Sequence, residues 1–177
     1  NAGREIMQYT LQPGALSLSD MRALWAGPFT VSLDDSCRAA VRAARKLVDD
    51  RVASGSVDYG ITTGFGLLAN THIPADQVEE LQENLVLSHM AGTGDPIDAS
   101  TTRLIMVLKA SSLGQGVSGI REELIDALLA MVSADILPII PSKGSVGASG
   151  DLAPLAHMTA ALIGVGDVMV GGERMSA

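Results

Sequence analysis

The chain has 177 residues, which is enough for one domain with a substantial buried core. Apolar residues make up 47% of the sequence and aromatic residues only 3%, so the predicted core is aliphatic. A formal net charge of −8 argues against a nucleic-acid-binding protein and against binding to anionic membranes, because both partners attract clustered Lys and Arg.

Cysteine, apolar runs and histidine restrict the class of protein further. Cys37 is the only cysteine, so no disulfide can form within the chain, and a cytoplasmic location is predicted. The longest apolar stretch, residues 152–170, is interrupted by proline, histidine, glycine and aspartate, so we expect no membrane span and no signal peptide. His72, His89 and His157 are too scattered to predict a metal site.

The first third of the chain predicts two helices. A short extended piece precedes a helix over residues 19–26, in which Trp25 is interpreted as a packing residue. Ser32 and Asp35 have the spacing of a capping box and predict the start of a long amphipathic helix that ends at Gly55. Its predicted buried face is Cys37, Val41, Ala44, Val48 and Val52, and its predicted solvated face is Arg38, Arg42, Arg45, Lys46, Asp49 and Asp50.

The remainder predicts four more helices, over residues 74–90, 98–115, 118–134 and 152–163. The fold class is therefore mainly α, with a few short strands. Pro138 ends the third of these helices and leads into a glycine-rich loop. The apolar faces predicted for the second and third are Leu104, Leu108 and Ser111, and Ile120, Leu124, Leu128 and Met131.

The loop at residues 144–151 reads Gly-Ser-Val-Gly-Ala-Ser-Gly-Asp, and its glycines indicate backbone that turns tightly. It is not a serine nucleophile elbow, because Asp151 stands where that motif needs its second glycine. It is not a phosphate-binding loop either, because Lys143 precedes the glycines instead of following them. Asp151 is predicted to cap the helix that begins at Leu152.

Residues 144–157 fit Gly-x-x-Gly-Ala-Ser-Gly-Asp-Leu-x-Pro-Leu-Ala-His and resemble the signature of the aromatic amino acid ammonia-lyase family. In that family the triplet, here Ala148, Ser149 and Gly150, closes on itself to form the electrophile 4-methylidene-imidazol-5-one. Small neighbours allow the amide nitrogen of Gly150 to reach the carbonyl carbon of Ala148. Loss of the Ser149 hydroxyl as water then leaves an exocyclic methylidene carbon. The resemblance implies this self-derived group and no metal.

Residues 59–66, Tyr-Gly-Ile-Thr-Thr-Gly-Phe-Gly, are the second informative stretch. By themselves they predict a glycine-rich loop with a packed tyrosine. They resemble the Tyr-Gly-x-Asn/Thr-Thr-Gly-Phe-Gly loop of the same family, which folds over the prosthetic group, and Thr62 stands where asparagine is common. The resemblance implies that Tyr59 removes the β-proton of the substrate, which requires surroundings that favour its phenolate. Gly66, having no Cβ, is predicted to allow close substrate contact.

Ser88 and His89 end the predicted helix over residues 74–90, on the face expected to be apolar. A histidine in such a place is usually a core residue with a satisfied hydrogen bond. In the resembling family, however, this pair discriminates substrates, and Ser-His marks the members that act on histidine. An imidazole substrate needs hydrogen-bond partners for its ring nitrogens when it is desolvated, which an apolar pair would not supply.

The resemblance covers nearly all of residues 8–175. It implies that residues 1–177 are the N-terminal helical domain of a fumarase/aspartase-like lyase fold, that the downstream part of this fold is absent, and that the enzyme is a homotetramer. His157 is interpreted as structural support beneath the ring. Because downstream site residues are missing, the isolated chain is predicted to be inactive.

Three functions remain open at this point. The first is elimination of ammonia from L-histidine to give trans-urocanate, the first step of histidine degradation. The second is another lyase or an aminomutase with the same prosthetic group and a tyrosine or phenylalanine substrate. The third is a non-catalytic helical fragment that acts only in assembly with partner chains.

Overall fold

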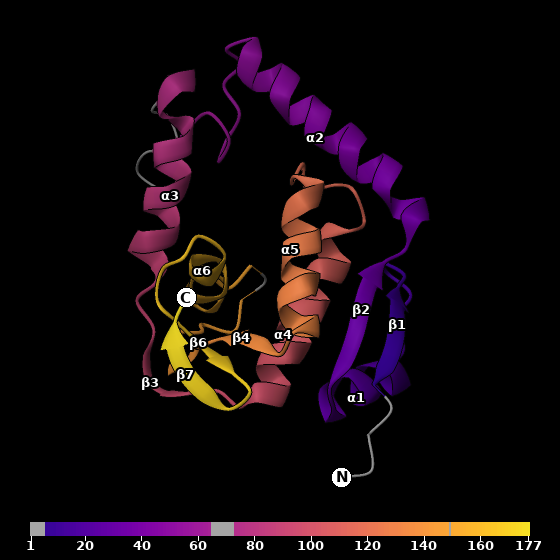
Figure 1. The fold of residues 1–177 in the computed structure, drawn as a ribbon. Coiled ribbons are helices and arrows are strands. Elements are labelled where there is room, and N and C mark those ends of the chain that lie inside the picture. The colour runs from indigo at the N-terminus through magenta and orange to yellow at the C-terminus, as the bar shows by residue number, and fades with distance from the viewer. Residues whose placement is uncertain (1–5, 65–72, 149) are drawn as a thin grey trace.

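The computed structural model describes residues 6–64, 73–148 and 150–177, and within these ranges the chain is mainly α-helical, as predicted (Figure 1). Two 3-10 turns, η1 (Asp35–Cys37) and η3 (Ala75–Gln77), lead directly into helices. The α-helices are α1 (Leu18–Ala26), α2 (Arg38–Ala53), α3 (Val78–His89), α4 (Ala99–Leu113), α5 (Glu122–Ser133) and α6 (Leu152–Leu162).

The strands of the described residues form three small sheets, one parallel and two antiparallel. The parallel sheet pairs β1 (Met7–Leu11) with β2 (Phe29–Leu33). The first antiparallel sheet pairs β3 (Thr93–Pro96) with β5 (Pro141–Lys143). In the second antiparallel sheet, β6 (Asp167–Val170) lies between β4 (Ile136–Pro138) and β7 (Glu173–Ser176).

The last sheet contains a hairpin that the sequence analysis missed. Val170 pairs with Glu173, so β6 and β7 are joined by the two residues Gly171 and Gly172. Both glycines have positive φ, 58° and 91°, which the tight primed turns of hairpins require. Alternating apolar residues beside a Gly-Gly pair are a hairpin signal, but the strands have only four residues each and the signal is short.

The core lies around α4 and α5, which stand side by side at the centre of the molecule (Figure 1). The β1–β2 sheet packs against α5 on one side, and β4 and α6 lie on the other. Met106, Val107 and Ala110 of α4 and Ile125 of α5 are fully buried, and Phe29 of β2 joins them. The core is therefore predominantly aliphatic, as the composition predicted.

The helix faces agree with the predictions only in part. In α4 the side chain of Leu108 is exposed, whereas Met106 and Val107 are buried, because the apolar residues of this helix do not gather on one face and its period therefore singles none out. Residues 118–121 are not helical: Arg121 has an extended backbone, with φ −69° and ψ 138°, and α5 begins at Glu122. Trp25 is 48% exposed, so its interpretation as a packing residue is wrong for this chain.

The start of α2 also differs from the prediction. Ser32 lies within β2, opposite Thr10 of β1, so its backbone belongs to a sheet and cannot cap a helix. Asp34 has that role instead: its carboxylate accepts a hydrogen bond from the Ser36 N–H at 2.9 Å and begins η1. The predicted apolar face is confirmed in register, since Val41 is buried on α2 and Cys37, which precedes the helix, packs against the core.

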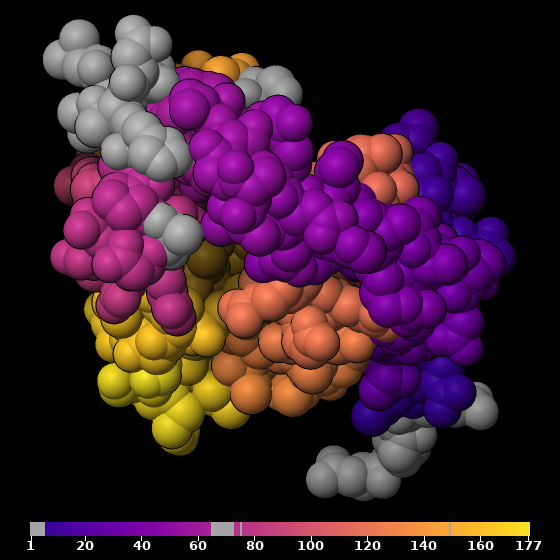
Figure 2. Space-filling model, turned by 90° about the horizontal axis from the view of Figure 1, so that it is seen from above, coloured from indigo at the N-terminus to yellow at the C-terminus, as the bar shows by residue number. Residues whose placement is uncertain are grey.

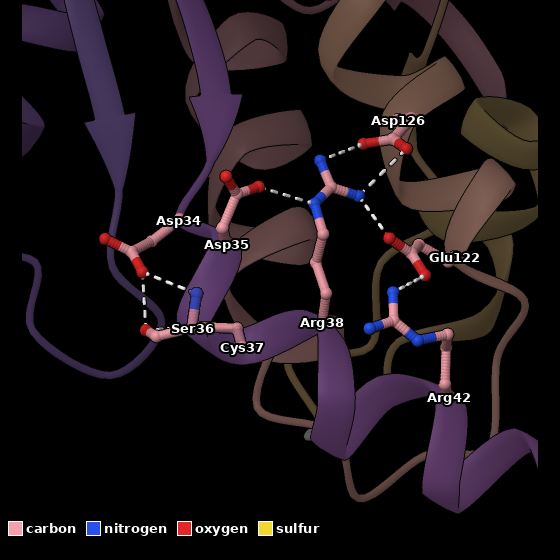
Figure 3. A network of polar contacts seen from close by, with 8 residues as sticks. All are labelled: Asp34, Asp35, Ser36, Cys37, Arg38, Arg42, Glu122 and Asp126. Atoms are coloured by element: carbon pink, nitrogen blue, oxygen red, sulfur yellow. Dashed lines mark hydrogen bonds and ion pairs between the residues drawn. The ribbon is translucent and has the colours of Figure 1, made fainter.

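Two cations of α2 join this helix to α5 (Figure 3). The guanidinium of Arg38 donates to both carboxylate oxygens of Asp126 at 3.1 Å and also to Glu122, and Arg42 donates to Glu122 at 2.9 Å. These contacts lower the pKa of the Glu122 carboxyl, the Arg38 contact most strongly. The prediction of a solvated face is therefore wrong for Arg38, whereas Arg42 and the Lys46–Asp50 pair remain exposed.

Among the helices of the described ranges, none is both long and apolar enough to cross a bilayer.

Candidate active site

The Ala-Ser-Gly loop connects β5 to α6. Ala148 and Gly150 are exposed, and Ser149 lies outside the described residues. Gly147 and Gly150 have positive φ, 67° and 71°, so the backbone turns tightly just before the triplet and at its last residue. The structure thus agrees with the prediction of a tight loop and leaves the prediction for the Ser149 side chain untested.

Asp151 organises the loop and does not cap the helix with its side chain. It occupies the residue before α6, but its carboxylate makes no capping hydrogen bond. It accepts instead from the Ser145 hydroxyl and, at 3.2 Å, from the Val146 N–H. These hydrogen bonds, that of Ser145 first, lower the pKa of the Asp151 carboxyl. The carboxylate therefore ties residues 145–146 to the start of α6 across the triplet.

Ser88 and His89 form the last turn of α3, as predicted, with Ser88 exposed and His89 half-buried. Nδ1 of His89 lies 2.8 Å from the carbonyl oxygen of Leu85, and the Ser88 hydroxyl donates to the same oxygen at 3.1 Å. A carbonyl can only accept, so we assign the proton of the neutral ring to Nδ1. Nε2 of His89 is then an acceptor that a ligand N–H can use.

The segment that follows α3 contacts α6 and the start of the triplet loop. Nε2 of His157, on α6, accepts a hydrogen bond from the Gly92 N–H at 3.0 Å. A Cβ at Gly92 would lie 3.0 Å from that ring nitrogen and 3.3 Å from the Lys143 carbonyl oxygen, so any larger residue would force these neighbours to shift by a few tenths of an ångström. Gly92 thus connects the end of α3 to the start of the triplet loop.

His157 is 8% exposed, and burial lowers the pKa of its imidazole. A neutral ring is needed for Nε2 to accept from Gly92, so burial and the hydrogen bond favour the same protonation state. Thr93 pairs with Lys143 in the β3–β5 sheet, so the contact at Gly92 continues directly into that sheet. The prediction that His157 is a structural support is consistent with these contacts, although the ring that it was predicted to support is not tested by them.

Tyr59 lies in the turn that follows α2 and is 65% exposed. Figures 1 and 2 show this segment beside α3, and the Ile73 N–H donates to the Thr62 carbonyl at 2.8 Å just before α3 begins. α3 has 12 residues, about 18 Å of helix, between this point and His89. The printed contacts therefore join the segment just after His89 to the start of the triplet loop, and join Thr62, at the end of the Tyr59 turn, to the residues that precede α3. Gly66 lies outside the described residues.

A cavity of about 210 Å³ opens elsewhere, between the start of α4 and the β4–β6 strands. Its lining does not include any of the predicted site residues, and the described ranges hold no group of three or more His, Cys, Asp or Glu that could bind a metal ion. The cavity is lined by Pro96, Ile97, Ala99, Thr102, Asp135, Leu137, Pro138, Ile139, Met169 and Gly172.

Comparison with known proteins identifies the family. The sequence profile of the aromatic amino acid lyases matches residues 16–177. The chain belongs to this family. The match includes both signature loops and the Ser88–His89 pair, so the resemblance drawn from those residues is confirmed.

Curated relatives and solved structures agree with this assignment. Over 168 residues the chain is 57% identical to a histidine ammonia-lyase of Burkholderia orbicola (strain MC0-3) and 56% identical to one of Burkholderia multivorans (strain ATCC 17616 / 249). Each alignment covers 95% of this chain and 33% of the relative. The chain thus spans about a third of the length of the curated relatives it matches.

Among solved structures, the fold is similar to histidine ammonia-lyase from Trypanosoma cruzi, with a TM-score of 0.86 and 34% identity over 96% of this chain and 32% of that one. It is also similar to an ergothioneine-degrading enzyme from Treponema denticola, with a TM-score of 0.91 and 29% identity over 96% of this chain and 34% of that one. The helical lyase fold is thereby confirmed.

Sequence reasoning missed the residues that hold the two loops in place. Ser145 and Gly92 have no motif of their own, and their roles depend on partners six and 65 positions away. Arg51 and Asp58, which form an ion pair beside Tyr59, are seven positions apart and lie on either side of the end of α2. The available signal for this ion pair was Gly55, where the chain reverses and returns the residues after α2 towards the last turn of that helix.

Proposed function

We propose that the enzyme to which this chain belongs eliminates ammonia from L-histidine to give trans-urocanate. The observation that carries the proposal is the junction at Gly92, where the Ser88–His89 end of α3 meets the triplet loop through His157. A substrate ring held by the pair would thereby have its amino acid portion directed to Ala148–Gly150. The 57% identity to a histidine ammonia-lyase supports the choice of reaction.

The residues present fit the prosthetic group 4-methylidene-imidazol-5-one. Ala148 and Gly150 are small and exposed, and the backbone turns at Gly147 and Gly150, which suits the compression that ring closure needs. Asp151 holds the flanking residues from one side. When formed, the group supplies an electron sink that the coded side chains lack.

Ser88 and His89 are the proposed specificity residues. With Nδ1 of His89 donating to Leu85, Nε2 remains to accept from an imidazole N–H of the substrate. The Ser88 hydroxyl, already directed at the Leu85 carbonyl, supplies a second polar atom at the same end of α3. A substrate without ring nitrogens would leave Nε2 of His89 without this partner once the bound substrate excludes water, and a desolvated polar group without a partner is costly.

Tyr59 is the proposed base for the β-proton, and Gly66 a proposed point of close substrate contact. Thr62, at the end of the exposed Tyr59 turn, is hydrogen-bonded to Ile73 before α3 begins, whereas His89 ends that helix, and this separation supports a site completed by protein beyond this chain. We therefore also propose a homotetramer whose subunits complete one another's sites, acting in the cytoplasm on a free amino acid.

The test uses the complete enzyme, with this chain joined to the remaining two thirds of the family length. We expect urocanate absorbance on adding histidine, and a mass lower by two waters at residues 148–150. Ser149→Ala should keep the fold and reduce turnover at least about a thousandfold, because no hydroxyl remains to be lost. Undiminished turnover in this variant would refute the electrophile assignment.

A panel of amino acids distinguishes the alternatives. Tyrosine, phenylalanine and ergothioneine, the last being what the similar Treponema denticola enzyme degrades, should be poor substrates beside histidine. If the enzyme turns over one of them faster than histidine, that compound is the substrate, and the proposed prosthetic group and its chemistry still stand. An unreacted triplet together with no turnover of any substrate would instead favour a chain that acts only in assembly.

A further inference from the structure

Thr62 is a buried polar residue at the base of the Tyr59 loop, with an exposed fraction of only 2%. Its hydroxyl donates to the Ser56 carbonyl at 2.6 Å and accepts from the Asp58 N–H at 2.8 Å. Its own N–H donates to the Asp58 carbonyl at 3.0 Å, and its carbonyl accepts from the Ile73 N–H at 2.8 Å. Every polar group of Thr62 is thus engaged, and the partners lie on both sides of the loop.

The turn that Thr62 closes contains Tyr59. Asp58 and Thr62 flank this tyrosine, and the Ile61 N–H also donates to the Asp58 carbonyl at 3.1 Å. The hydroxyl of Thr63 accepts from the Gly60 N–H at 3.2 Å. The backbone on both sides of Tyr59 is therefore fixed by hydrogen bonds that depend on two threonine hydroxyls.

An ion pair attaches this turn to α2. The guanidinium of Arg51, in the last turn of the helix, donates to both carboxylate oxygens of Asp58, at 3.0 and 2.8 Å. This contact is the main reason that the pKa of the Asp58 carboxyl is lowered. The Ser56 N–H donates to the Arg51 carbonyl at 3.2 Å, so side chain and backbone connect the same two segments.

We infer that Thr62 is a positioning residue for the proposed reaction: its hydroxyl fixes the turn that carries Tyr59, and the Arg51–Asp58 pair fixes that turn on α2. The inference rests on the proposed function, in which Tyr59 takes the substrate proton. A base atom must lie within about 2.6–3.2 Å of the atom whose proton it removes, and a misplacement of about 1 Å can cost about 100-fold in rate.

The Thr62 hydroxyl is suited to this role because both of its partners are backbone groups. Replacing it with a methyl group of the same shape leaves the Asp58 N–H and the Ser56 carbonyl without their partner. The turn can then regain hydrogen bonds only by moving, and Tyr59 moves with it. Serine keeps the hydroxyl and should keep the turn.

The experiment compares Thr62→Val, Thr62→Ser and Thr30→Val in the complete enzyme with histidine as substrate. Thr30 is an exposed residue of β2 and controls for the loss of a threonine hydroxyl. We expect Thr62→Val to lower kcat about 10- to 100-fold, with KM changed less than about threefold and the loss of two waters intact. Thr62→Ser should recover kcat to within about threefold, and Thr30→Val should match the wild type.

The inference is overturned if Thr62→Val keeps kcat within about twofold of the wild type, or if Thr62→Ser fails to restore it. If Thr62→Val does not fold, Arg51→Met is tested in its place, with Lys46→Met on the same helix as the control. Arg51→Met should then lower kcat by more than about threefold and Lys46→Met leave it unchanged, and equal values would refute the inference. A wild-type enzyme that does not deaminate histidine would instead contradict the proposed function itself.

Discussion

The core around α4 and α5 and the two signature loops differ in how much of their surroundings this chain supplies. Ile125 is fully buried among side chains from α4, α5 and β2. Val146, in the triplet loop, is 81% exposed, and Tyr59 is 65% exposed. The core is therefore completed by segments of this chain, whereas the loops are held by a few polar contacts and leave much of their surface exposed.

The largest effect predicted from this difference concerns activity. The 177-residue chain alone should produce no urocanate from histidine, because Tyr59 and the triplet loop are largely exposed in it. Absorbance of urocanate, measured beside the complete enzyme as the positive control, checks this expectation. Measurable urocanate from the chain alone would mean that the loops already form a site.

The second prediction contrasts one side chain from each region. Ile125→Ala should lower the free energy of unfolding by about 2–5 kcal/mol, because a cavity remains in a closed core. Val146→Ala removes two methyl groups that already meet solvent and should change stability by less than about 0.5 kcal/mol. Urea unfolding of both variants gives the comparison, and equal losses would show that the triplet loop is packed as tightly as the core.

The third prediction concerns pH and the junction between the regions. Burial lowers the pKa of His157, so the unfolded chain binds its proton more readily than the folded one. Stability is then complete above about pH 6.5 and falls as the pH decreases below it, by at most about 1.4 kcal/mol per pH unit. Carboxyl groups with lowered pKa, such as Asp151, lose their contribution only at lower pH.

His157→Gln is the matched variant, since its amide oxygen can accept from Gly92 but does not titrate. Urea midpoints of the wild type should fall between pH 7 and pH 5, and those of the variant should stay level. If the urea midpoint of the variant falls with pH as steeply as that of the wild type, the group responsible is not His157.

The smallest effect is predicted for the ion pairs of α2. Arg38→Met should lower Tm by about 2–4 °C, because Arg38 is largely covered and joins α2 to α5 through Glu122 and Asp126. Lys46→Met, which removes an exposed pair within α2, should shift Tm by less than about 1 °C. Thermal unfolding followed by circular dichroism measures both Tm shifts, and similar shifts would mean that the ion pairs between α2 and α5 add nothing to the stability of the fold.

Several elements were predictable because their signals are local. Asp98 caps α4 through the Thr101 N–H, and Pro74 and Met90 bracket α3, so both helices appear within a few residues of their predicted positions. Predictions were wrong where a partner distant in sequence decided the outcome. Ser32 has the spacing of a helix cap, but it lies in β2 and pairs with β1. Asp151 stands at the cap position of α6, but its carboxylate accepts a hydrogen bond from Ser145 in the preceding loop.

The sequence by itself determined the family and the chemistry proposed for it, because residues 59–66 and 144–157 and the pair Ser88–His89 carry their identity in adjacent positions. Only the tertiary structure decided which of these segments meet. The hydrogen bond from Gly92 to His157 joins residues 65 positions apart, and that from Arg38 to Glu122 joins residues 84 apart. Such contacts depend on how helices pack, and the pattern of residues along one segment does not contain that information.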